Sequence, residues 1–173
     1  MPKPTMKVFR AADAPLFENE EGSITMAPSA AEGLGRLVEG GMEDGSVLKT
    51  LFDGPGFGLH YAWFKPNYQL GRHSHSLDAI YYIVSGSLKL GNEWLGAGDG
   101  FFLPADVPYI YTVGEEGLEL LEFRHSAHFT THVPGAGKAF WDRALETIEA
   151  NREAWLKAVP PRPAEVRSRE PVS

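Results

Sequence analysis

Apolar residues form short runs, or alternate with polar residues, through most of the chain between positions 47 and 123. Runs that are rich in β-branched and aromatic residues and bounded by Gly, Pro, Asn or Asp are typical of β-strands. The pattern predicts strands over 47–52, 58–64, 79–84, 87–90, 100–103, 109–113 and 118–123, and shorter ones over 24–26 and 34–38. Short strands at this spacing indicate a barrel or a sandwich.

The pattern changes towards the C-terminus. Trp141, Leu145, Ile148 and Trp155 recur at the spacing of one helical face, with charged residues at most other positions. This predicts one amphipathic helix over 139–157, which the prolines from position 160 onwards end. The pattern divides the chain into an N-terminal arm over 1–21, a β-barrel over 22–133, a helical segment over 134–159 and a flexible tail over 160–173.

Composition narrows the classes of function. The 173 residues suit one domain, and the absence of cysteine excludes disulfides, thiolate metal sites and a cysteine nucleophile. The net charge of −7 without a long basic run disfavours nucleic acid and anionic membranes as partners. No stretch has the ~20 apolar residues of a membrane span or the apolar core of a signal peptide, so we expect a cytoplasmic protein.

Two histidines stand out as candidate metal ligands. Alternate side chains of a strand share one face, so His73 and His75 are expected to project the same way. Two imidazoles on one strand can bind a single ion of Zn, Cu, Fe or Ni, although at least one more protein ligand is usual. A pair of histidines without a metal is the alternative.

The surrounding stretch, from Asn67 to Gly86, resembles the first motif of the cupin superfamily, G-x5-H-x-H-x3-E-x6-G. In this alignment His73 and His75 take the places of the two motif histidines. Asn67 replaces the first glycine, and Ala79 replaces the metal-binding glutamate. The resemblance therefore keeps two of the ligands and loses the carboxylate.

A second stretch, from Gly98 to Val113, resembles the second cupin motif, G-x5-P-x-G-x2-H-x3-N. Gly98 and Pro104 match it. Asp106, Tyr109 and Val113 replace its second glycine, its histidine and its asparagine. The two motifs and the strands between them imply an all-β fold: a single cupin barrel, of double-stranded β-helix or jelly-roll type, followed by the C-terminal helix.

The resemblance also implies a site. A divalent transition metal (Fe, Zn, Ni or Mn) is expected at His73 and His75, and His125, at the end of the strand after the second motif, is the preferred third ligand. Tyr109 is a weaker ligand candidate, because its pKa of ~10 must first be lowered by the metal. Tyr109 and Tyr81 are candidate proton donors or acceptors. His60, on the strand before the first motif, is a further residue that can face inward.

Two functions follow from this reading. The first is a small-molecule-binding, metal-dependent cupin that acts on a small oxygenated organic compound by dioxygenase, isomerase or lyase chemistry. The alternative is a non-catalytic ligand-binding or sensory cupin that has lost a full metal site, so whether the chain is an enzyme stays open.

We also expect a homodimer, because cupin barrels often pair. The apolar residues Val8, Phe9, Leu16 and Phe17 of the arm can cross to a partner sheet. The apolar helix stripe either joins the contact or packs on its own barrel.

Overall fold

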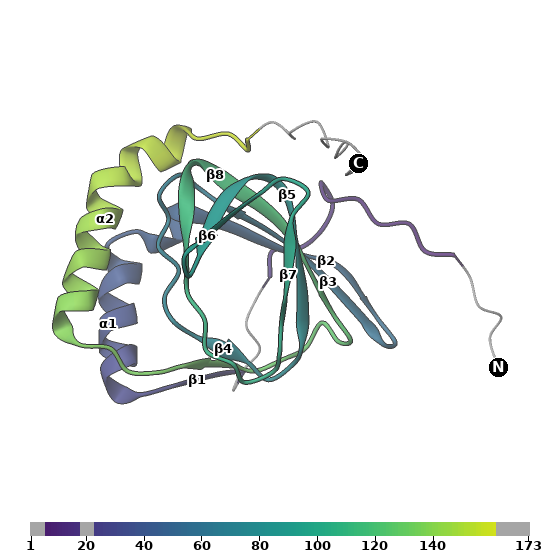
Figure 1. The fold of residues 1–173 in the computed structure, drawn as a ribbon, viewed down its shortest axis with the longest axis horizontal. Helices are drawn as coiled ribbons and strands as arrows, with labels where there is room; N and C mark the ends of the chain where they lie inside the picture. Colours follow the sequence, from purple (N-terminus) through teal and green to yellow (C-terminus); the bar gives the residue numbers. More distant parts are fainter. Residues whose placement is uncertain (1–5, 18–22, 162–173) are drawn as a thin grey trace, which may run out of the picture.

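The computed structural model describes residues 6–17 and 23–161, and it arranges them as two β-sheets with two α-helices packed outside (Figure 1). The elements, in chain order, are β1 (Ile24–Met26), α1 (Pro28–Glu39), the short 3₁₀ helix η1 (Met42–Gly45), β2 (Ser46–Gly54), β3 (Phe57–Phe64), β4 (Ser74–His75), β5 (Ala79–Leu90), β6 (Glu93–Gly96), β7 (Gly100–Leu103), β8 (Tyr111–Arg124), β9 (Thr131–Val133) and α2 (Lys138–Lys157).

The larger sheet has six strands in the order β2-β3-β8-β5-β6, with β7 paired to β5, and all its pairings are antiparallel. The smaller sheet has the order β1-β9-β4. The larger sheet curls, and the smaller sheet lies along one end of it (Figure 1). Both sheets contribute side chains to one pocket, which is lined by His75 of β4, by His73 just before β4, and by residues of β3 and β8.

The strand predicted over 34–38 is wrong, because these residues belong to helix α1. Pro28 occupies the first turn of this helix, and its buried face is made by Ala30, Gly33 and Leu37. A Cβ atom at Gly33 would lie 2.2 Å from the ring of Trp141 in α2. The glycine therefore permits close helix packing instead of marking a turn, and the fold has a helix that an all-β prediction lacks.

The predicted C-terminal helix is confirmed as α2, whose apolar stripe is covered within its own chain. Trp141, Ile148 and Trp155 are buried, and the indole N–H of Trp155 donates to the carbonyl of Pro66 at 2.8 Å. Helix α2 packs on α1 and η1. The stripe is thus unavailable as a contact with another chain.

Two pairs of predicted strands are each one long strand. Residues 79–84 and 87–90 both lie in β5, and residues 111–113 and 118–123 both lie in β8. Gly86 in β5 and Gly117 in β8 both have a positive φ, and a Cβ atom at Gly86 would lie 2.0 Å from the Gly117 carbonyl oxygen. The pairing register of β5 with β8 shifts beside Gly86, and both strands continue through these glycines.

The described part of the N-terminal arm pairs with its own chain. The Phe17 N–H donates to the Leu48 carbonyl at 2.9 Å, and the Thr50 N–H donates to the Pro15 carbonyl at 3.1 Å, so the arm lies along edge strand β2. The remainder of the predicted arm and most of the predicted tail, positions 1–5, 18–21 and 162–173, lie outside the described residues. No described helix is long and apolar enough to cross a membrane.

Candidate functional site

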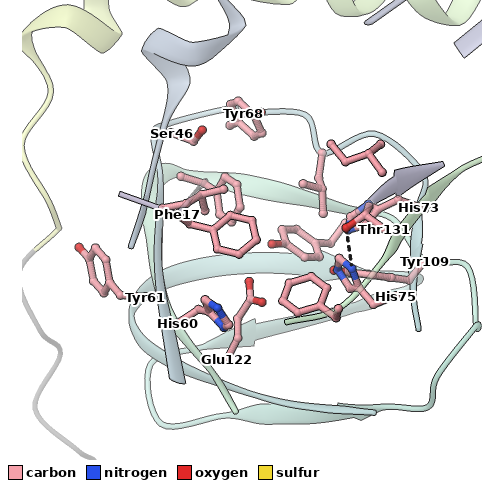
Figure 2. A pocket seen from close by; sticks show the side chains of 16 residues that line it. Phe17, Ser46, His60, Tyr61, Tyr68, His73, His75, Tyr109, Glu122 and Thr131 are labelled. Carbon is pink, nitrogen blue, oxygen red and sulfur yellow. Dashed lines mark hydrogen bonds between the residues drawn. The ribbon is translucent and has the colours of Figure 1, made fainter. Parts of the chain in front are cut away.

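A cavity of about 200 Å³ lies between the two sheets (Figure 2). Aromatic and aliphatic side chains form most of its lining, among them Phe17, Leu48, Phe64, Leu70 and Phe129. Polar side chains gather at two places on this lining, one around the two motif histidines and one around His60 and Glu122 (Figure 2).

The structure brings His73 and His75 together, as strand alternation predicts. Their ring centroids are 4.8 Å apart, and their planes are inclined by 74°. The Nδ1 of His73 lies 2.7 Å from the Gly71 carbonyl, and the Nδ1 of His75 lies 3.2 Å from the Thr131 hydroxyl oxygen. Because a carbonyl can only accept, His73 carries its hydrogen on Nδ1 and keeps a lone pair on Nε2.

Both imidazoles are neutral in the folded protein. Burial lowers the pKa of His73. Burial, followed by the repulsion that a protonated His73 would exert, lowers the pKa of His75 to about 2, so both rings are neutral near pH 7. Neutral imidazole is the form that binds a metal or accepts a hydrogen bond. The pair is therefore in the state that either use requires.

Tyr109 and Tyr81 complete this end of the cavity. The backbone of Tyr109 pairs with that of His73, and the Tyr109 hydroxyl lies 3.3 Å from His75 Nε2 and 2.9 Å from the Tyr81 hydroxyl. Burial raises the pKa of both phenols. They stay protonated near neutral pH and can donate hydrogen bonds, whereas proton transfer from them needs a strong acceptor or a nearby positive charge.

Arg124 and Glu122 extend these contacts, and neither was identified as a site residue from the sequence. The Arg124 guanidinium donates to the Tyr81 hydroxyl at 2.9 Å and to the Glu122 carboxylate at 2.6 Å. Since arginine can only donate, one assignment of hydrogens satisfies a whole chain of contacts, in which Arg124 donates to Tyr81, Tyr81 to Tyr109 and Tyr109 to His75. Leu118 and Leu120 are apolar residues at alternate positions of strand β8. Continuing the alternation by two residues at a time gives Glu122 and Arg124, so the sequence pattern does predict that their side chains face inward.

His125, the preferred third ligand, is exposed, and it is not among the residues that line the cavity. Arg124 precedes it and points inward, so strand alternation turns His125 outward. The structure therefore does not bring His125 to the histidine pair. Ala79, which stands in place of the motif's glutamate, is buried and faces inward as expected.

The donor set fits part of a metal site. Metal-binding histidines usually have a hydrogen-bond partner on the other ring nitrogen, and both His73 and His75 have one on Nδ1. The Tyr109 hydroxyl, 3.3 Å from His75 Nε2, is an additional oxygen beside the pair. Within residues 6–17 and 23–161, no three His, Asp or Glu side chains are grouped as a metal site would require. The residues present thus supply two imidazole ligands and no carboxylate.

The backbone around the histidines keeps the shape that the motif glycines would give it. Asn67 and Asp106, which replace two motif glycines, have φ angles of 61° and 60°, in the left-handed region that favours glycine. Asn and Asp enter this region more readily than other side chains because their short polar groups bond locally. The lost glycines are therefore replaced by residues with the same backbone preference.

No protein-family model matches the sequence, and no curated protein is significantly similar to it. Among solved structures, the polyketide cyclase RemF from Streptomyces resistomycificus matches with a TM-score of 0.54 at 16% identity, over 84% of this chain and 97% of that chain. A variant of oxalate decarboxylase from Bacillus subtilis matches with a TM-score of 0.45 at 19% identity, over 50% of this chain and 26% of that chain. An RmlC-like cupin from Shewanella frigidimarina matches with a TM-score of 0.43 at 21% identity, over 56% and 82%.

The chain thus spans about a quarter of the length of the oxalate decarboxylase chain that it matches. The likeness to RemF covers nearly the whole of both chains, and at 16% identity it concerns the fold alone. With both motif segments meeting at one pocket, this protein has the cupin fold.

Proposed function

We propose that this protein binds a small oxygenated organic molecule in the cavity between its sheets, with one ligand oxygen at His73, His75 and Tyr109. The observation that carries the proposal is the convergence of neutral imidazoles and phenols at one end of an otherwise apolar cavity of about 200 Å³. An apolar lining with a few convergent polar groups suits a small organic ligand.

In the enzymatic form of this proposal, His73 and His75 would hold one divalent transition metal (Fe, Zn, Ni or Mn) through their Nε2 atoms. A metal there would supply Lewis-acid polarisation of a ligand oxygen or oxygen chemistry. Tyr109, which stays protonated, can donate a proton to an oxygen held beside the pair. Tyr81, held by Arg124, can then donate a hydrogen bond to the resulting phenolate and stabilise it. Dioxygenase, isomerase and lyase reactions are the classes that this arrangement suits.

A specific contact favours a second candidate, a non-catalytic binding protein without a metal. The Tyr109 hydroxyl already contacts His75 Nε2, so the lone pair that a metal would use has a partner from the chain itself. Ala79 offers no ligand, and the buried charge of Arg124 makes the addition of a divalent cation less favourable. In this form the pocket holds the same class of ligand without turning it over.

Metal content separates the two forms. Protein purified without a histidine tag would be reconstituted in turn with Fe(II), Zn(II), Ni(II) and Mn(II), dialysed and analysed by mass spectrometry of the metal. We expect about one metal per chain in the wild type and none in the double variant His73→Ala/His75→Ala, whose circular dichroism should be unchanged. The matched control is His128→Ala, which removes an exposed histidine that contacts Asp53 and should keep the metal.

Two outcomes would redirect the proposal. Full metal content in the double variant would place the metal elsewhere on the chain. A reconstituted wild type without stoichiometric metal would exclude the enzymatic form and leave the non-catalytic one.

A further inference from the structure

A second polar region lies on the wall of the cavity away from the histidine pair. It consists of His60 on β3 and Glu122 on β8, which are register partners in the antiparallel pairing of these strands. Register partners project to the same face of a sheet, and both side chains line the cavity. Figure 2 shows them together on the side opposite His73 and His75.

His60 is buried, and the backbone of Ala127 approaches its ring without meeting the distance and angle of a hydrogen bond. It is 5% exposed, and neither of its ring nitrogens has a hydrogen-bond partner among the described residues. Its ring packs edge-on against Phe17 and Phe129, with centroid distances of 5.1 and 5.6 Å. Burial is the main cause that lowers its pKa, while Glu122 and the backbone of Ala127 act in the opposite direction. The neutral ring has one donor and one acceptor, and leaving both buried without a partner is costly.

Glu122 adds an anionic acceptor beside this histidine. Its Oε2 atom accepts from Arg124 at 2.6 Å, which offsets the negative charge. Within the described segments no group donates to its Oε1 atom. Its side chain is 15% exposed, so the carboxylate can be reached from the cavity.

An apolar ring separates the two polar regions. Phe129 lies between them, with its centroid 5.6 Å from His60 and 4.9 Å from His75 and its plane nearly perpendicular to both imidazoles. A ligand that contacts both regions must therefore place an apolar portion along Phe129. An aromatic ring suits this portion of the ligand, because aromatic rings pack well against one another.

We propose that His60 and Glu122 receive a hydroxyl group of the ligand, so that this site takes a small aromatic compound with a hydroxyl at one end and a second oxygen at the other. The hydroxyl donates to the Glu122 carboxylate and accepts from the imidazole N–H of His60. This inference rests on the proposed function, because it assigns the second oxygen to His73, His75 and Tyr109.

The test compares three neutral probes that share one ring and one amide. Isothermal titration calorimetry would measure the affinity for para-hydroxybenzamide, for benzamide, which lacks the hydroxyl, and for para-methoxybenzamide, which can accept but not donate. We expect para-hydroxybenzamide to bind the wild type about tenfold or more tightly than either of the others, because hydrogen bonds to a charged group are among the stronger ones.

Two variants locate the preference. His60→Phe keeps an aromatic ring between Phe17 and Phe129, so it should fold normally while the preference for the hydroxyl falls to about threefold or less. Glu122→Gln should also reduce the preference, and if it unfolds because Arg124 loses its partner, His60→Phe still decides. The control Glu116→Gln changes an exposed carboxylate of the same strand and should keep the full preference.

The outcomes distinguish this inference from the proposed function. Equal affinity of the wild type for benzamide and para-hydroxybenzamide, or an unchanged preference in His60→Phe, would overturn the hydroxyl site alone. In that case, the proposed function would still be supported if the wild type binds benzamide and the Tyr109→Phe variant binds it more weakly. Failure of all three probes to bind would overturn both.

Discussion

At the scale of single residues, the backbone conformation of Asn67 limits which side chains this position accepts. Its φ of 61° lies in the left-handed region, and its side-chain amide makes only a long contact of 3.4 Å with Asn151. The position therefore depends on backbone preference more than on side-chain bonding. The same argument applies to Asp106, with a φ of 60°.

Replacing Asn67 separates backbone preference from side-chain effects. Asn67→Gly should change the free energy of unfolding by less than about 1 kcal/mol, because glycine adopts this conformation freely. Asn67→Val should lower it by about 1–2 kcal/mol, because a β-branched side chain is strained there. Urea denaturation measures both changes. Equal stability of the two variants would show that strain at this position is unimportant.

The buried imidazole of His60 predicts a dependence of stability on pH. Its pKa in the folded protein is lowered from 6.5, so below pH 6.5 the unfolded chain binds a proton that folded His60 does not. The contribution of His60 to the free energy of unfolding is therefore complete above pH 6.5. Below pH 6.5 the free energy of unfolding falls with pH, by at most about 1.4 kcal/mol per pH unit from this group. Urea denaturation at pH values from about 7 to about 5 should show a smaller loss for His60→Phe than for the wild type. Identical pH slopes would show that His60 takes up its proton in the folded protein.

At the scale of elements, the two glycines inside α1 have opposite surroundings. A Cβ atom at Gly33 would overlap the Trp141 ring at 2.2 Å, whereas a Cβ atom at Gly35 would meet nothing within 4 Å. The first glycine is required by helix packing, and the second lowers helix propensity without a packing reason. This difference makes the packing of α1 on α2 directly testable.

Gly33→Ala should lower the free energy of unfolding by about 1–3 kcal/mol, because the added methyl group overpacks the contact with Trp141. Gly35→Ala, the matched control in the same helix, should raise it by about 0.5–1 kcal/mol. Thermal and urea denaturation would measure both. A stabilising effect of both substitutions would mean that α1 does not pack tightly on α2 in solution.

At the scale of the whole molecule, the outer face of the larger sheet carries a row of exposed apolar side chains. Ile80 is the register partner of both Phe102 and Phe123, and the three side chains are 56%, 60% and 42% exposed. Adjacent exposed apolar residues on neighbouring strands mark an interaction surface more often than scattered ones do. The described part of the arm pairs with β2 of its own chain, so this row is a second candidate for the contact between chains, beside the arm.

We expect a homodimer in which this row meets the same row of a second copy across a two-fold axis. Sedimentation equilibrium should give about twice the chain mass of 19.0 kDa for the wild type. Ile80→Lys should give the monomer mass, because a charge at the centre of the row would be buried without a partner. Leu156→Lys, which changes an exposed apolar residue on α2, should leave the dimer intact. A wild type at monomer mass at micromolar concentration would contradict the expectation.

Local patterns in the sequence determined most of the strands, the C-terminal helix and the shared direction of His73 and His75. These features follow from geometry within a few residues, since side chains alternate along a strand and recur every three or four residues along a helix. The cupin motifs singled out Tyr109 as a candidate site residue, and its hydroxyl lies 3.3 Å from His75 Nε2 in the structure. For these features no distant contact had to be known.

Only the tertiary structure decided the remaining features, because each depends on residues that are far apart along the chain. In the sequence, the glycines of α1 indicate turns. The structure shows that Gly33 instead makes room for the ring of Trp141. Alternation alone points Glu122 inward, but only the pairing of β3 with β8 places it beside His60. His125 follows the site along the strand, but Arg124 before it points inward and His125 is exposed, away from the histidine pair. The partners of a side chain are set by strand pairing and helix packing, which a local pattern does not contain.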